Sequence, residues 1–178
     1  MGYFVLLKRF IIRKAFRDRR ISLDTNEYER LVALYLDCIY RIALSGCKNY
    51  MDAEDVVQNT FMKLLEKEEC FEDDELAKFW LIRVAMNECK SLWRTSWKRK
   101  VTSMEDMAYE PAFVMPERSN LYYAVRELPI KYRQVVHLYY FEDYSVREIA
   151  GIMKISETAV QNRLLRARQK LKEKLKEA

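Results

Sequence analysis

The stretch SVREIAGIMKISETAVQNRLLRARQKL, residues 145–171, decides the fold of this chain. Ser145 precedes an apolar run and has Glu148 three residues later, which is the pattern of a capping box at the start of a helix. Ser156 can cap a second helix after a tight turn. Two helices joined in this way, the second one basic on its outer face, are typical of a helix-turn-helix DNA reader.

Each of these two helices has an apolar face at helical spacing, which we expect to point inward: Ile149, Ala150, Ile152 and Met153 in the first, and Ala159, Val160, Leu164 and Leu165 in the second. The polar side chains of the second helix are then left outside: Thr158, Gln161, Asn162, Arg163, Arg166 and Arg168. Glutamine and asparagine suit adenine edges, and arginine suits guanine or phosphate. A helical hairpin with a solvated basic face is the alternative interpretation.

Lys154 stands in the turn, where glycine is usual because a left-handed backbone conformation is often needed there. A residue other than glycine in that conformation costs on the order of 1 kcal/mol. We expect the fold to tolerate this cost with a somewhat looser turn.

The composition of the whole chain favours an all-helical protein of one or two small domains. Its 178 residues are 50% hydrophobic and include only 3 glycines and 3 prolines. Leucine, lysine, arginine, glutamate and tyrosine are abundant, and no convincing alternation of apolar and polar residues indicates a sheet.

The charges are segregated along the chain, whose formal net charge is +5. Residues 144–178 carry nine lysines and arginines against four acids, and residues 90–100 carry five basic residues and no acid. Residues 52–75 instead hold ten acids and two lysines. Two basic segments and a separate acidic one suit a protein that binds both nucleic acid and a protein partner.

Few residues in the chain could support catalysis or bind a metal. The cysteines (Cys38, Cys47, Cys70 and Cys89) form no Cys-x-x-Cys pair, and His137 is the sole histidine. We therefore expect buried or half-buried reduced thiols in a cytoplasmic protein, with no metal site. Without a glycine-rich phosphate loop or a ligand cluster, we expect no catalytic residues, no cofactor and no small-molecule substrate.

The N-terminal extension, residues 1–24, is basic and partly apolar. It is too short and too charged for a membrane span and lacks the order of a secretory signal. We expect an amphipathic helix resting on the rest of the protein, with a membrane-surface helix as the alternative. A helical block at residues 25–99, a linker with two prolines at residues 100–119 and a second helical block at residues 120–178 follow.

Three helices are predicted in the first block. One spans residues 27–43, with core positions at Leu31, Leu34, Tyr35, Cys38, Ile39 and Ile42. Another spans residues 52–65, with Asp52 as its N-cap and a core face of Val56, Val57, Thr60, Phe61, Leu64 and Leu65. The third runs from about residue 75 to residue 99, with core positions at Phe79, Leu81, Ile82, Ala85, Met86 and Cys89.

The later turns of the third helix interleave aromatic and basic residues. Trp93 and Trp97 alternate there with Lys90, Arg94 and Lys98. Aromatic faces stack unpaired bases and cations bind phosphates, so this pattern suits contact with a melted DNA strand. The alternative is that the tryptophans belong to the core, which we favour for Trp80.

Four ordered motifs resemble the extracytoplasmic-function class of bacterial RNA polymerase sigma factors. DAEDVVQNTF at residues 52–61 is similar to the family's core-binding helix, D-A-E-D-L-V-Q-E-T-F, and WLIRVAMN at residues 80–87 resembles its promoter-melting helix, F-x-x-W-L-x-R-I-A-x-N. LPIKYRQVV at residues 128–136 resembles the beginning of its fourth region. Residues 148–168 match E-I-A-x-x-L-x-I-S-x-x-T-V-x-x-R-L-x-R-A-R, and the resemblance extends over about residues 25–171.

The resemblance implies a promoter-specificity subunit with two helical domains on a flexible tether. The first would bind the clamp coiled coil of core RNA polymerase through Asp52, Glu54, Asp55, Gln58 and Asn59. Its third helix and the loop at residues 68–74 would capture the −10 element and a flipped-out base, with Arg83, Asn87, Lys90, Trp93, Arg94, Trp97 and Lys98 as DNA contacts. The second domain would sit on the polymerase flap and contact the −35 element through Thr158, Gln161, Asn162, Arg163 and Arg166. An anti-sigma factor, soluble or membrane-bound, is a further implied partner.

The chain departs from the family pattern at a few positions. Ala77 stands where phenylalanine is expected before Trp80, with Phe79 two places later, and Ala159 replaces a common threonine. A stand-alone helix-turn-helix regulator is the alternative function. The acidic helix at residues 52–59 argues against it, because such a surface has no evident role on DNA.

Overall fold

The computed structural model describes residues 24–47, 49–67, 70–98 and 120–176, without the side chains of 93, 95–98 and 122. In that part of the chain every regular element is a helix, which confirms the all-α prediction. The chain divides into two compact units, residues 1–98 and residues 99–178. The predicted linker and all of the N-terminal extension except Asp24 lie outside the described residues.

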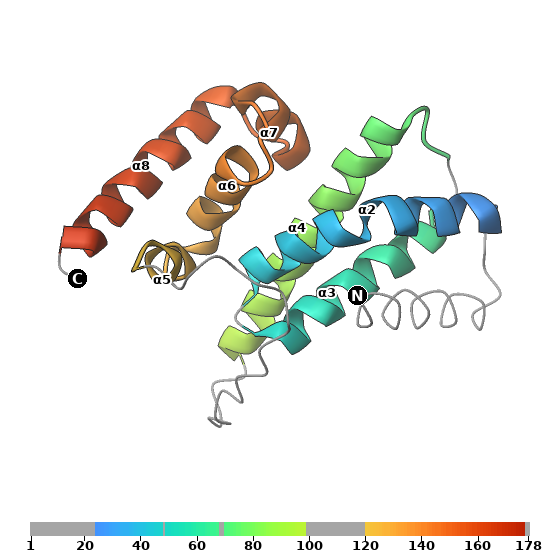
Figure 1. Cartoon of the computed structure of the whole chain (residues 1–178), viewed down its shortest axis with the longest axis horizontal. Coiled ribbons are helices and arrows are strands. Elements are labelled where there is room, and N and C mark those ends of the chain that lie inside the picture. Colours follow the sequence, from blue (N-terminus) through green and yellow to red (C-terminus); the bar gives the residue numbers. More distant parts are fainter. Residues whose placement is uncertain (1–23, 48, 68–69, 99–119, 177–178) are drawn as a thin grey trace. The chain divides into compact units, whose positions relative to one another are not determined.

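The first unit contains α2 (Thr25–Gly46), α3 (Tyr50–Leu65) and α4 (Asp74–Lys98), and each of them packs against the other two (Figure 1). Apolar residues at helical spacing form the shared core, because three such stripes can bury one another only by facing a common axis. The largest fully buried side chains there are Tyr28, Leu31, Ile39, Phe61, Leu64, Leu81 and Ile82.

Two predictions for α2 and α3 are wrong. Leu34 is 52% exposed because the buried stripe of α2 extends through Val32 and Leu36, on the side away from Leu34. Asp52 is not the N-cap of α3: Asn49 is, and its side-chain oxygen accepts a 2.8 Å hydrogen bond from the Asp52 backbone N–H. Asp52 still lies in the first turn, where the helix dipole favours a negative charge.

The second unit contains α5 (Asn120–Arg126), α6 (Ile130–Tyr140), α7 (Val146–Met153) and α8 (Glu157–Lys176). α8 contacts the other three helices, and Ala167 joins a buried cluster with Leu128, Tyr132 and Val136. Leu165 is 52% exposed, so the prediction that it faces inward is wrong. The inward face of α8 runs through its other apolar positions, Val160, Leu164, Ala167 and Leu171.

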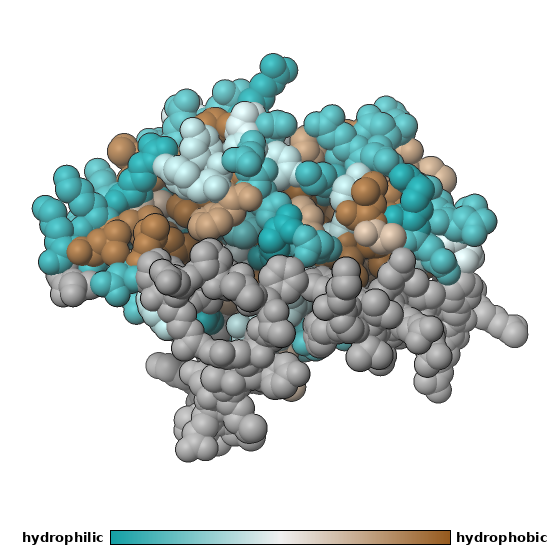
Figure 2. Space-filling model, viewed as in Figure 1, coloured by the Kyte–Doolittle hydropathy of each residue, from teal (hydrophilic) through white to brown (hydrophobic). Residues whose placement is uncertain are grey.

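On the face shown in Figure 2, the described residues form a mainly hydrophilic surface with smaller hydrophobic patches. The large hydrophobic side chains that remain exposed include Met51 at 79% and Phe141 at 62%. Among the described helices, none has the length and hydropathy needed to cross a membrane.

Candidate functional site

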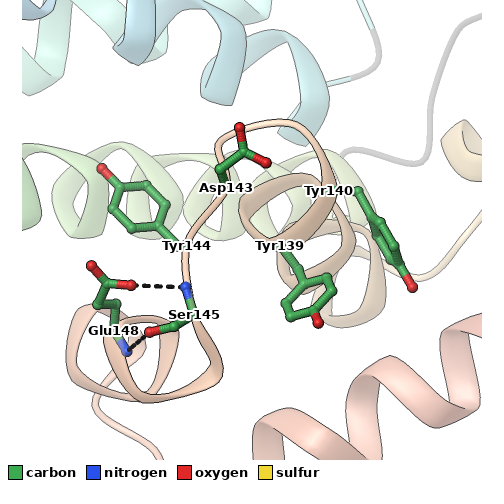
Figure 3. A pocket seen from close by; sticks show the side chains of 6 residues that line it. All are labelled: Tyr139, Tyr140, Asp143, Tyr144, Ser145 and Glu148. Carbon is green, nitrogen blue, oxygen red and sulfur yellow. Dashed lines mark hydrogen bonds between the residues drawn. The ribbon is translucent and has the colours of Figure 1, made fainter.

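The first helix of the predicted helix-turn-helix begins with the expected capping box. The Ser145 Oγ accepts a 3.2 Å hydrogen bond from the Glu148 N–H, and the Glu148 carboxylate accepts a 2.8 Å bond from the Ser145 N–H (Figure 3). These two bonds satisfy donors that the first turn of α7 would otherwise leave without a partner. The two bonds fix the residue at which α7 begins, and α7 in turn packs against α8.

A hollow of about 460 Å³ lies where α6 turns into α7 (Figure 3). Its lining consists mostly of hydroxyl and carboxylate side chains, namely Tyr139, Tyr140, Asp143, Tyr144, Ser145 and Glu148. Asp143 has a φ of 56°, and aspartate tolerates this left-handed conformation better than most residues. The turn is closed by the Tyr144 N–H, which donates a 3.0 Å hydrogen bond to the Leu138 carbonyl.

The turn between α7 and α8 has the left-handed residue that was predicted for it. Lys154 has φ 52° and ψ 52°. The Ile155 N–H donates a 3.1 Å hydrogen bond to the Ala150 carbonyl, which satisfies an acceptor at the end of α7. The prediction that Ser156 caps α8 is also confirmed, since its Oγ accepts a 3.2 Å bond from the Ala159 N–H.

The residues predicted to contact the −35 element lie in the first turns of α8. Thr158, Gln161, Asn162 and Arg166 are exposed, and Arg163 is half-buried. Arg166 also forms a hydrogen bond with the Tyr132 hydroxyl, and this contact lowers the pKa of Tyr132. This hydrogen bond ties the Arg166 side chain to α6.

Arg168, which the sequence also placed on the outer face, contacts the end of α6. Its Nε donates a 2.8 Å hydrogen bond to the Tyr140 hydroxyl, and its guanidinium carbon lies 5.8 Å from the centre of the Tyr140 ring. This contact holds α8 against α6 next to the hollow described above, and it gives Arg168 a structural role.

The residues predicted to bind core polymerase lie on the side of α3 that faces away from the core. Asp55 and Asn59 are exposed, and Asp52, Glu54 and Gln58 are half-buried. Partial burial and the neighbouring charge of Asp55 raise the pKa of Glu54. Together these side chains form a mostly acidic, hydrogen-bonding surface.

The residues predicted to contact the −10 element follow one stripe of α4. Arg83, Asn87, Lys90 and Arg94 recur at intervals of four, three and four residues, which places them above one another on a helix. Asn87 and Arg94 are exposed, and Arg83 and Lys90 are half-buried. The side chains of the other three, Trp93, Trp97 and Lys98, lie outside the described ones.

Trp80 is half-buried and not part of the buried core that we favoured for it. Its ring centre lies 5.7 Å from that of Phe71, with the ring planes inclined at 60°. The Lys67 ammonium nitrogen lies over the Phe71 ring, 4.7 Å from the ring centre. Phe79 is half-buried as well, whereas the other predicted core positions of α4 are buried.

Arg133 is a buried residue to which the sequence pattern gave no role. Its side chain is only 2% exposed, and its Nη1 donates a 2.9 Å hydrogen bond to the Arg126 carbonyl at the end of α5. A charged residue in α6 is ordinarily expected on the surface, so no local signal could have predicted this contact. Arg133 therefore connects α5 to α6.

The thiols of Cys38, Cys47 and Cys89 are buried, as predicted. Cys70 is exposed, so the expectation of burial is wrong for this residue. It lies in the segment before α4, whose neighbours Glu72 and Asp73 are hydrophilic and also exposed.

Comparison with known proteins supports the motifs described above. The chain matches the families described as "Sigma-70 region 2", over residues 31–99, and "Sigma-70, region 4", over residues 118–171. It is 32% identical over 152 residues to the ECF RNA polymerase sigma factor SigM of Bacillus subtilis (strain 168), covering 81% of this chain and 92% of SigM. It is also 32% identical to SigV of the same organism, covering 76% of this chain and 87% of SigV.

A solved structure has a similar fold. It is the co-crystal structure of the sigma factor RpoE in complex with the anti-sigma factor NepR from Bartonella quintana. The match has a TM-score of 0.70 at 26% identity and covers 84% of this chain and 97% of RpoE. The helix-turn-helix, the ordered motifs and these relatives lead to one conclusion: the chain belongs to the ECF class of RNA polymerase sigma factors.

Proposed function

We propose that this promoter-recognition subunit of RNA polymerase uses three separate surfaces: the outer side of α3 for core polymerase, a stripe of α4 for the −10 element, and the first turns of α8 for the −35 element. The observation that carries the proposal is the alignment of Arg83, Asn87, Lys90 and Arg94 along α4, while the acidic side chains lie on a different helix, α3. A basic DNA-contacting stripe and an acidic protein-contacting side on one small domain suit a subunit that joins polymerase to promoter DNA.

The polymerase surface consists of Asp52, Glu54, Asp55, Gln58 and Asn59. Asp55 and Asn59 are exposed and lie one helical turn apart, so they form the centre of the contact. The charged and amide side chains around them would attract a polymerase surface of complementary charge. This attraction speeds association and favours the correct partner.

The −10 surface would bind a strand that is being melted. Arg83, Lys90 and Arg94 contact phosphates, and Asn87 lies between them with an exposed amide that can form hydrogen bonds with a base edge. Extruding a base from the stack costs a few kcal/mol, which stacking and a pocket must offset. Trp93, Trp97 and Lys98 complete this surface in the proposal.

The −35 surface consists of Thr158, Gln161, Asn162, Arg163 and Arg166 at the start of α8. Gln161 and Asn162 suit adenine edges, while Arg166 suits guanine or phosphate. Two weak DNA contacts on one chain gain affinity through effective concentration when polymerase holds both domains at the promoter spacing.

The protein is a DNA-binding transcription initiation factor, and we infer that it is not an enzyme and acts in the cytoplasm, where polymerase and promoters are. RpoE of Bartonella quintana was crystallised with the anti-sigma factor NepR. We infer that this chain also has an anti-sigma partner, which would cover polymerase-binding or DNA-binding surfaces until it is released.

A band-shift experiment tests the proposal against a stand-alone helix-turn-helix regulator. Promoter DNA is mixed with the purified chain, with core polymerase, and with both. We expect specific binding only when both are present, because neither DNA surface alone holds the promoter tightly. Tight, sequence-specific binding by the chain alone would contradict the proposal and favour the regulator.

A further inference from the structure

Two buried thiols meet where the end of α2 lies against α4. Cys47 is the residue that follows α2, and Cys89 lies within α4. Their sulfur atoms are 3.8 Å apart, and their side chains are 3% and 0% exposed. The two sulfurs are thus in direct contact, although 42 residues separate them in the sequence.

The backbone next to this pair is shaped around the Cys89 side chain. A Cβ atom added to Gly46 would lie 2.4 Å from the Cys89 Sγ and 2.9 Å from its Cβ. Glycine at this position therefore lets Cys89 approach the last turn of α2. The Cys47 N–H donates a 2.9 Å hydrogen bond to the Ala43 carbonyl, which holds Cys47 at the end of the helix.

We propose that Cys47 and Cys89 form a reversible dithiol–disulfide site inside the first domain. The sulfurs need to approach by only about 1.8 Å to reach the S–S bond length of about 2.0 Å. Rotation of the two side chains and a small shift at the end of α2 provide this movement. The proposal does not depend on the proposed function, because its test requires neither polymerase nor DNA.

The oxidant is a hydroperoxide, and the reaction has two balanced steps. The Cys47 sulfur attacks one peroxide oxygen, the O–O bond breaks, and a sulfenic acid and water (or the alcohol, from an organic peroxide) form. The Cys89 sulfur then attacks the sulfenic sulfur, the S–O bond breaks, and a second water leaves with the Cys89 proton. The two sulfurs together lose two electrons, and a small thiol reverses the change by exchange.

Cys47 is the residue that we expect to react first. It follows the last turn of a helix, and helix ends open locally at a lower free-energy cost than the middle of a packed helix. Cys89, within α4 and fully buried, then acts as the resolving thiol. The disulfide links Cys47 to Cys89 and so closes a loop in the unfolded chain. The loop lowers the conformational entropy of the unfolded state, which stabilises the fold.

The test uses the full chain with the Cys38→Ala and Cys70→Ser substitutions, which leave only the proposed pair. The protein is oxidised with hydrogen peroxide, its remaining thiols are alkylated under denaturing conditions, and its peptides are mapped by mass spectrometry. We expect a monomer lighter by two hydrogen atoms, a Cys47–Cys89 linked peptide, and a Tm of the first domain that rises by about 10 °C and returns after reduction.

The matched control adds Cys47→Ala to the same background and should show neither the linked peptide nor the rise in Tm. Peptide mapping of the unsubstituted chain after the same treatment gives the same answer without any substitution. Complete alkylation of both thiols after oxidation, or sulfenic and sulfinic products without a link, overturns the proposal.

Discussion

Arg30 on α2 forms a two-point ion pair with Asp74, the first residue of α4, with 2.9 Å between Arg30 Nη1 and Asp74 Oδ2. Glu27 binds the same guanidinium, with 2.8 Å between its Oε2 and Arg30 Nε. The Tyr35 hydroxyl donates a further 2.8 Å hydrogen bond to the Asp74 carbonyl. These contacts hold the start of the helix that carries the proposed −10 stripe against α2.

This ion-pair cluster should make the stability of the first domain depend on pH. Hydrogen bonds from Arg30 lower the pKa of Asp74 and of Glu27 from their ordinary values of 3.8 and 4.5. A carboxylate whose pKa is lower in the folded state stabilises the fold above its unfolded pKa, and this contribution is lost as the pH falls through the folded pKa. The first domain should therefore lose stability below about pH 4.5, partly through this cluster.

The Arg30→Ala variant tests this dependence by urea unfolding at about pH 6 and about pH 3.5. We expect the free energy of unfolding of Arg30→Ala to decrease less, from the higher pH to the lower, than that of the unsubstituted chain. The control is Arg94→Ala, which removes an exposed arginine from the same helical unit. Equal acid losses for Arg30→Ala and the unsubstituted chain would contradict the role of the cluster.

Gly46 and Gly151 should respond oppositely to the same substitution. Gly46→Ala places a Cβ atom 2.4 Å from the Cys89 Sγ, so we expect a loss of about 1–3 kcal/mol from overpacking. Gly151→Ala, also in a helix, meets nothing within 4 Å and should stabilise the second domain by about 0.5–1 kcal/mol. Denaturant unfolding of each domain measures both, and a stabilising Gly46→Ala would contradict the close contact with Cys89.

Reversing one charge on the proposed polymerase surface should abolish complex formation. Asp55→Lys puts a cation on the exposed outer side of α3, away from the core, so the fold should remain intact. Co-purification with core polymerase and circular dichroism measure the two effects. Glu29→Lys is the control, because it makes the same change of charge at an exposed acid of α2. Normal co-purification of the Asp55→Lys variant with core polymerase would contradict the proposal that α3 binds core polymerase.

Removing the Arg166 guanidinium should weaken recognition of the −35 element by about 1–3 kcal/mol. Tyr132→Phe should weaken it less, because this change removes only the hydroxyl that holds Arg166 and keeps the buried ring. Holoenzyme binding to promoters with intact and altered −35 elements measures the effect. Lys172→Ala is the control for general loss of charge on α8. A similar loss at Lys172 and at Arg166 would indicate that Arg166 contributes only non-specific attraction.

The helix-turn-helix could be predicted in detail because its signals are local. The capping box at Ser145, the left-handed Lys154 and the cap at Ser156 each depend on residues within a few positions of one another. The all-α fold and most core positions followed in the same way from helical spacing. The functional assignments of the exposed residues stay predictions, which the experiments above test.

The errors arose where a local pattern allows two choices or where the decisive contact is distant. Leu34 and Leu165 lie at the edges of apolar stripes, and only the packing of neighbouring helices decides which edge is covered. Asn49 and Asp52 are both good N-cap residues three positions apart. The Arg30–Asp74 pair joins residues 44 apart, which no short-range pattern can reveal.

Transcription in vitro is the most direct test of the central claim that this chain gives core polymerase its promoter specificity. The purified chain and core polymerase are combined on genomic DNA fragments, with each component alone as a control. We predict defined transcripts from a small set of fragments only when both are present, and their loss with Asp55→Lys. Equal transcription with and without the chain, or specific promoter binding by the chain in the absence of polymerase, would contradict the account.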